Sequence, residues 1–166
     1  QTADTHTHTQ VGKWDLIIAH PPCTYISNAG VRFLYPGGKG ILNEERLKKG
    51  IEATHFFLRF LYADCDRIAI ENPIPTKVYC LPPYTQIIQP WMFGHPVQKK
   101  TCLWLKGLPP LTPTEIIADY KPYVSCGTSR NKGNPDKSGT SRRGGAQKVR
   151  SKTFPGIAAA MAEQWG

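Results

Sequence analysis

Two short apolar runs, separated by one helix-length segment, constrain the fold of this 166-residue chain more than any other feature. Residues 14–19 (WDLIIA) stop at residues 20–22 (HPP), and residues 67–71 (RIAIE) stop at residues 72–75 (NPIP). Continuous β-branched runs of this length are typical of buried parallel strands, and proline opposes their continuation. We therefore expect two strands, each ending at a loop.

The segment between the two runs predicts an amphipathic helix. Asn43 is a favourable N-cap and two glutamates follow it. Its predicted apolar face consists of Leu47, Ile51, Thr54, Leu58 and Leu61, widened by Phe56, Phe57 and Phe60, with Gly50 weakening the helix slightly. A strand, a crossover helix and a parallel strand form one βαβ unit, in which both strands end at the same sheet edge.

The remaining segments complete one α/β domain. A third strand is expected at residues 101–105, and a helix at 155–165, where proline occupies the first helical position. The predicted organisation is a polar tail (1–13), a catalytic α/β domain (14–120), a basic Gly/Ser-rich segment (121–152) and a C-terminal helix packing back on the domain (153–166).

Positive charge is concentrated in one segment. The formal net charge is +9, and residues 121–152 contain nine basic residues and one acidic residue. Such a segment is typical of a phosphate-backbone footprint, and Arg142 and Arg143 are its central candidates for DNA binding. A solvated linker is the simpler interpretation, and both hold if the segment orders on DNA.

The cysteine pattern and the hydropathy of the chain argue against a disulfide-rich, a zinc-binding and a membrane-spanning protein. The five cysteines include no Cys-x-x-Cys pair, which indicates free thiols in a reducing compartment rather than a disulfide framework or a zinc site. His6 and His8 lie in a polar terminal stretch, and we predict no metal. No apolar run is long enough to span a membrane, so we expect a cytoplasmic protein without a membrane partner.

Cys23 and Glu71 are the candidate chemical groups. Each follows or ends a predicted strand, and ligands of open α/β sheets gather at the carboxyl ends of the strands. Taken singly, a lone cysteine is more often a small buried hydrophobe, and a Glu-Asn-Pro turn more often carries a solvated glutamate. Their shared order and strand context favour the catalytic interpretation.

Three motifs carry a resemblance to a known family. In order and context, residues 21–23 (PPC), 71–73 (ENP) and 98–100 (QKK) resemble the Pro-Cys, Glu-Asn and Gln-Arg-Arg motifs of the DNA cytosine-5 methyltransferase family. Residues 21–30 look like the nucleophile loop of that family. Residues 154–158 are weakly similar to the helix start that closes over its cofactor. Residues 19–23 (AHPPC) are most similar to the corresponding segment of short phage and prophage-type methyltransferase-like proteins.

The resemblance implies an α/β, partial Rossmann-like fold of the S-adenosylmethionine-dependent methyltransferases, with parallel strands and crossover helices. It implies transfer of a methyl group from S-adenosyl-L-methionine to carbon 5 of a cytosine flipped out of DNA. Cys23 would attack carbon 6 and Glu71 would protonate ring nitrogen 3. The implied residues are Cys23, Glu71 and Lys100 for catalysis, Pro22, Ser27, Asn72, Gln98, Lys99, Arg142 and Arg143 for DNA, and Pro21, Phe154 and Gly156 for the cofactor.

The sequence departs from the family pattern at four places. Lys100 replaces the first arginine, Cys102 replaces the second, and Thr24 replaces a glutamine. The strand and the Gly-rich Phe-x-Gly-x-Gly turn that receive the cofactor are not found before Trp14. The expectation is a truncated chain, a chain that obtains its cofactor half from a second polypeptide or an N-terminal segment, or one that no longer binds the cofactor.

Two other functions fit parts of the pattern. One is a catalytically silent DNA-binding module that keeps the methyltransferase scaffold. The other is a thymidylate-synthase-like nucleotide enzyme, whose Pro-Cys nucleophile is followed by a histidine where Thr24 stands. His20 and His95 could lower the pKa of the thiol or satisfy loop backbone instead.

Overall fold

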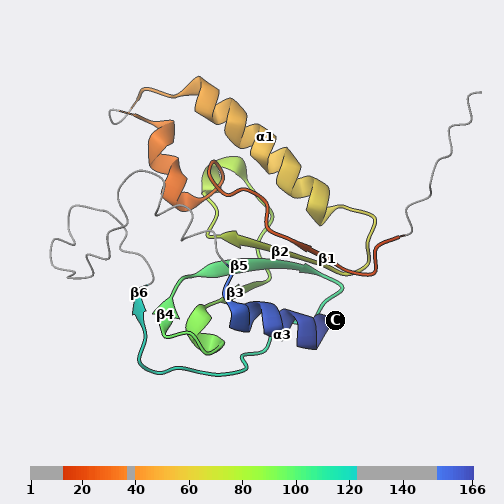
Figure 1. The fold of residues 1–166 in the computed structure, drawn as a ribbon. Coiled ribbons are helices and arrows are strands. Elements are labelled where there is room, and N and C mark those ends of the chain that lie inside the picture. Colours follow the sequence, from red (N-terminus) through yellow and green to blue (C-terminus); the bar gives the residue numbers. More distant parts are fainter. Residues whose placement is uncertain (1–12, 37–39, 123–152) are drawn as a thin grey trace, which may run out of the picture.

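The computed structural model describes residues 13–36, 40–122 and 153–166, which form a mixed four-stranded sheet with a helix on each face (Figure 1). The sheet order is β1-β2-β5-β3. These strands are β1 (Ile17–Ala19), β2 (Ile68–Pro73), β3 (Gln86–Ile88) and β5 (Thr101–Lys106), and the helices are α1 (Glu44–Leu61) and α3 (Pro155–Trp165). The α/β class expected from the sequence is confirmed.

The predicted βαβ unit is present. β1 and β2 pair in parallel from Ile17↔Ile68 to Ala19↔Ile70, and α1 connects them. Asn43 caps α1 as predicted, because its side-chain oxygen accepts a hydrogen bond of 2.9 Å from the backbone N–H of Arg46. The ends of β1 and β2 consequently lie side by side.

β5 runs antiparallel to both of its neighbours, so the sheet is mixed. A parallel return is usually made through a crossover α-helix, and the segment between Pro73 and Thr101 contains none. The chain between β2 and β5 instead holds the short 3-10 helices η2 (Lys77–Tyr79) and η3 (Pro90–Met92), together with β3 and β4 (Val97–Gln98). β4 pairs separately with β6 (Lys121–Pro122).

The expected end of the second strand at residue 71 is wrong by two residues. Asn72 pairs with Cys102 and Pro73 with Thr101. β1 pairs with β2 only as far as Ile70, so beyond this point β2 has a ladder on one side alone. A proline at the last position of such a strand can be accommodated.

Alternation along the strands builds two cores. Successive side chains of a strand point to opposite faces, and Ile68 and Ile70 lie under α1 whereas Ala69 lies on the α3 side. On the α1 side the buried cluster is Ala19, Ile26, Phe57, Cys65, Ile68, Ile70, Cys102 and Trp104. On the α3 side it is Ala69, Ile88, Phe93, Leu103, Leu111, Ile157, Ala160, Met161 and Trp165.

The predicted apolar face of α1 is confirmed in large part: Thr54 and Phe57 are buried, and Leu58, Phe60 and Leu61 pack against the core. Ile51 and Phe56, predicted on the same face, are 44% and 41% exposed. Gly50 is buried as well, because an added Cβ there would be 2.0 Å from the ring of Tyr79. The absence of a side chain at this position lets α1 approach η2 closely.

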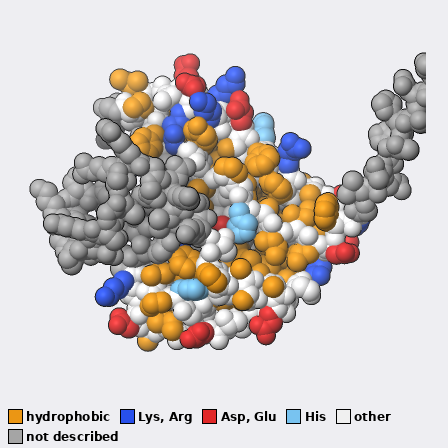
Figure 2. All heavy atoms as spheres, in the orientation of Figure 1, with side chains coloured by type: hydrophobic (Ala, Val, Ile, Leu, Met, Phe, Trp, Pro, Cys, Tyr) orange, Lys and Arg blue, Asp and Glu red, His pale blue; other side chains and the backbone are white. Residues whose placement is uncertain are grey.

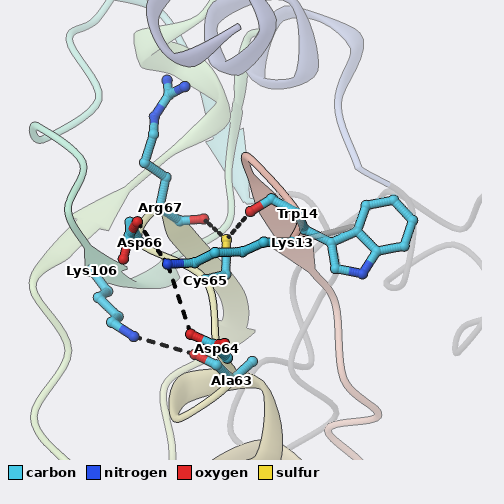
Figure 3. A network of polar contacts seen from close by, with 8 residues as sticks. All are labelled: Lys13, Trp14, Ala63, Asp64, Cys65, Asp66, Arg67 and Lys106. Carbon is cyan, nitrogen blue, oxygen red and sulfur yellow. Dashed lines mark hydrogen bonds and ion pairs between the residues drawn. The ribbon is translucent and has the colours of Figure 1, made fainter. Parts of the chain in front are cut away.

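The amino end of β1 is fastened to the start of β2 (Figure 3). Lys13 forms an ion pair of 3.0 Å with Asp66, and the Cys65 Sγ lies 3.1 Å from the carbonyl oxygen of Trp14. Arg67 donates to the carbonyl of Trp165, which joins the same region to the end of α3. These contacts hold β1 in register, so that its other end has a fixed position.

Candidate active site

The first pair of the candidate site follows from the strand register. Ala19 pairs with Ile70, so the next residues in each strand direction, His20 and Glu71, stand opposite one another. His20 Nδ1 lies 2.9 Å from Glu71 Oε2. The Glu71 side chain is 18% exposed and that of His20 41%, so the carboxyl group faces a sheltered site with one open side.

Asn72 fixes the chain beside this pair. Its side chain is buried, and Nδ2 donates a hydrogen bond of 2.7 Å to the carbonyl oxygen of Pro21. Alternation along β2 places Asn72 on the opposite face from Glu71. Asn72, predicted to bind DNA, therefore ties the end of β2 to the loop that carries Cys23.

The loop after β1 is held at several points. The N–H of Ser27 donates to the carbonyl of Cys23 at 3.0 Å, and the N–H of Thr76 donates to that of Ile26 at 2.8 Å. Ser27 is 7% exposed and bridges to Pro75, and its side chain is inside the loop rather than on its surface. Cys23 itself is partly exposed, so its thiol is not sealed inside the core.

Burial is the main influence on the thiol of Cys23, and it raises the pKa above the ordinary value. The negative charge of Glu71 raises the pKa further. A hydrogen bond from its own backbone N–H and the positive charge of Lys99 lower it. The thiol is therefore protonated at neutral pH, and Lys99 is the side chain that favours its ionisation.

Lys99 rather than Lys100 faces this site. Burial lowers the pKa of Lys99, while the charges of Glu71 and Cys23 act in the opposite direction. Its Nζ lies 5.7 Å from the centre of the Phe154 ring, at the start of α3. Lys100, predicted to be catalytic, is exposed. Because side chains alternate in extended chain, only one of two adjacent lysines can face the site.

Cys102 stands where the resemblance would place a second arginine. Its side chain is fully buried in the α1-side core, and burial, followed by the charge of Glu71, raises the pKa of its thiol to about 11. Cys102 is consequently a neutral core residue. The arginine fork that the family presents at this position has no counterpart in it.

The three predicted cofactor residues do not form a cradle among the described residues. The Pro21 carbonyl is taken by Asn72, and the Gly156 N–H donates to His95 Nε2 at 3.0 Å. An added Cβ at Gly156 would be 2.0 Å from the carbonyl oxygen of Phe93, so this glycine serves close packing. Phe154 contacts His95 and Lys99. These groups do not fit an S-adenosylmethionine site by themselves.

The other predicted residues lie further from the pair or outside the description. Pro22 is exposed in the loop, and Gln98 is exposed in β4. Arg142 and Arg143 fall within residues 123–152, outside the described part of the chain.

Sequence reasoning did not find two of the contacts. It weighed His20 as a modifier of the thiol, whereas the structure pairs it with Glu71. The register of the two parallel strands would have suggested the pairing of His20 with Glu71, because each residue follows a paired strand position. Arg46 also escaped notice, although its guanidinium donates to the carbonyls of Thr24 and Gly30 at 2.9 and 3.1 Å and holds the nucleophile loop against α1.

A scan of the sequence against models of known protein families found no match, and a search of curated proteins also found none. Across residues 13–36, 40–122 and 153–166, no three His, Cys, Asp or Glu side chains are grouped so that they could hold a metal ion. In the same ranges no helix has the length and apolar character needed to cross a membrane.

Proposed function

We propose that this chain carries the catalytic groups of a DNA cytosine-5 methyltransferase-like protein with a partial Rossmann-like fold. The observation that supports it most is the meeting of Cys23, Glu71 and Lys99 at the carboxyl ends of two parallel strands. The three come from separate motifs whose order along the chain resembles that of the family. A thiol, a carboxyl group and an ammonium group together match the needs of nucleophilic addition to a pyrimidine ring.

In the proposed reaction, Cys23 loses its proton to solvent and its sulfur forms a bond to carbon 6 of cytosine. The electron pair of the ring's 5,6 double bond moves between carbons 4 and 5. The pair between carbon 4 and nitrogen 3 moves to that nitrogen, which takes a proton from Glu71. Carbon 5 is then the nucleophilic carbon of an enamine. His20, bonded to Glu71 and open to solvent, returns a proton to the carboxyl group.

Lys99 acts on the first of these steps. Its charge lowers the pKa of the thiol against burial and against Glu71. Protonation of Glu71, which its role as an acid requires, removes the opposing negative charge. In the proposed reaction Glu71 therefore carries its proton when the thiolate forms.

The substrate and methyl donor are part of the same proposal. The substrate is a cytosine flipped out of DNA, because a base in a duplex does not present carbon 6 to a side chain. S-adenosyl-L-methionine supplies the methyl group when bound. The described residues offer it no cradle, and β1, at the edge of the sheet, gives a place where a second polypeptide or a further segment could complete the site.

The raised pKa of Cys23 favours a second candidate function. A protonated thiol is a poor nucleophile. A catalytically silent DNA-binding module with the same scaffold would not need a reactive thiol at this position.

Covalent trapping separates the two functions. The chain is incubated with DNA containing 2-pyrimidinone in place of cytosine, and the adduct is measured on a denaturing gel. We expect an adduct with the wild type and with Cys80→Ser, which removes an exposed thiol elsewhere, and none with Cys23→Ser. DNA binding without any adduct would overturn the catalytic proposal in favour of the silent module.

A further inference from the structure

A cavity of about 290 Å³ lies beside the nucleophile loop, between η1 (Asn28–Leu34) and the first turns of α1. Its lining combines aromatic and charged side chains: Tyr25, Phe33, Pro36, Asn43, Glu45, Arg46 and Lys49. The volume is at the lower end of the range for ligand sites, about 300–1,000 Å³. It would therefore suit one unit of a polymer better than a large free ligand.

Rings and cations in this cavity face one another. The Arg46 guanidinium carbon lies 5.0 Å from the centre of the Tyr25 ring and 5.2 Å from that of Phe33. Phe33 is 51% exposed, and the Arg32 guanidinium carbon also lies 4.7 Å from its ring centre, so a base could stack on this ring or on the guanidinium groups over it. Unpaired bases stack on aromatic rings and on guanidinium planes.

The two cations of the lining each have a hydrogen-bonding partner. Arg46 is anchored by the carbonyls of Thr24 and Gly30, and Lys49 forms an ion pair of 2.5 Å with Glu45. Glu45 is the one acidic residue in the lining, which leaves an excess of positive charge at the cavity. Figure 2 shows Lys and Arg side chains beside hydrophobic ones over the end of the molecule where α1 begins.

We propose that this cavity, the Tyr25–Phe33 pocket, binds the nucleotide next to the target base in a nucleic-acid strand. Its base stacks against Phe33 and its phosphate contacts Lys49. Tyr25 is two residues from Cys23, so their Cα atoms are at most about 7 Å apart. A neighbouring nucleotide of the same strand can span this distance. The assignment of this nucleotide as the target's neighbour rests on the proposed function of Cys23.

The test measures binding without chemistry. The affinity of the full chain for a fluorescently labelled single-stranded DNA is determined by anisotropy at several salt concentrations. We expect Phe33→Ala to weaken binding about tenfold, because one stacked base is lost. Lys49→Gln should reduce the slope of log affinity against log salt by about 0.7, the value for one lost phosphate contact on a single strand.

Two substitutions on α1 serve as matched controls. Phe56→Ala removes an exposed ring outside the pocket, and Arg59→Gln removes an exposed cation about 15 Å further along the helix. Neither should change affinity more than about twofold. A free mononucleotide in excess should compete weakly, which distinguishes a strand from a free nucleotide as the ligand.

The outcomes separate this proposal from that for Cys23. Wild-type binding that Phe33→Ala and Lys49→Gln leave unchanged would overturn the pocket, as would absence of binding to any strand. Pocket-dependent binding without a Cys23 adduct would overturn the catalytic proposal and leave the pocket standing as a nucleotide site. Complete displacement by the free mononucleotide would overturn the strand as ligand.

Discussion

Burial raises the pKa of the Cys23 thiol most, and two charged neighbours of opposite sign, Glu71 and Lys99, modify that pKa further. The sequence placed Cys23 and Glu71 near one another, because Cys23 follows one recognisable strand, Glu71 lies near the end of the next, and parallel strands share an edge. It assigned the catalytic role to Lys100 instead of Lys99, because which lysine faces the site depends on the local direction of the chain between β4 and β5.

The first prediction concerns the pH dependence of the thiol. Burial and Glu71 raise its pKa and Lys99 lowers it, so reactivity should increase as pH rises through that raised value. Glu71→Gln should move the midpoint to lower pH, and Lys99→Met should move it to higher pH. The measurement is the rate of iodoacetamide labelling of the Cys23 peptide by mass spectrometry, with Cys80 as an internal control. Identical midpoints in all three proteins would contradict the described electrostatics.

The second prediction concerns Asn72. Asn72→Ala removes the donor to the Pro21 carbonyl and leaves that acceptor without its side-chain partner. We expect a loss of about 1–3 kcal/mol in the free energy of unfolding, measured by urea titration. Asn28→Ala, an exposed site, should change it by less than about 0.5 kcal/mol. Equal effects at the two sites would argue against the buried tie.

At the scale of elements, β1, α1, β2, β5 and α3 could be predicted because each has a local signal: a β-branched run, an N-cap, or a proline at the first helical position. β3, β4 and β6 have two or three residues each, are not marked by a continuous β-branched run, and depend on partners distant in sequence. The buried position of Gly50 in α1 was not predicted for a similar reason, since it depends on Tyr79 in η2.

The contact between α1 and η2 gives the third prediction. Gly50→Ala would improve helix propensity by about 1 kcal/mol in an open helix, but here its Cβ meets the Tyr79 ring. We expect net destabilisation of about 1–2 kcal/mol. In the Tyr79→Ala background the same substitution should become stabilising. A double-mutant cycle by urea denaturation measures the reversal. The same sign in both backgrounds would contradict the close approach.

At the scale of the whole molecule, the fold is a mixed sheet whose two faces are covered by helices from distant parts of the chain (Figure 1). α3 covers the second face through Ile157, Ala160, Met161 and Trp165. Its position also sets the site, because Phe154 precedes it and contacts Lys99. The sequence predicted that α3 exists, but which face it covers depends on the alternation of strands paired across the sheet.

The fourth prediction tests the packing of α3 against the second face of the sheet. Trp165 is fully buried, and its indole N–H donates to the carbonyl of Pro109 at 3.1 Å. Trp165→Ala should cost about 3–5 kcal/mol in the free energy of unfolding. Trp14→Ala, at a side chain 64% exposed, should cost less than about 0.5 kcal/mol. Comparable losses for the two tryptophans would show that α3 does not seal the sheet.

The most direct test of the central claim is hydrogen exchange at carbon 5 of cytosine, which needs no methyl donor. After Cys23 adds to carbon 6, carbon 5 takes a deuteron from heavy water. Loss of the original hydrogen from carbon 5 and elimination of the Cys23 thiolate then restore the base with deuterium in place of that hydrogen, which is detected by mass spectrometry of the nucleosides. The account predicts exchange with the wild type, a reduced rate with Glu71→Gln and none with Cys23→Ser. Exchange that persists in Cys23→Ser, or wild-type exchange equal to that of DNA alone, would contradict it.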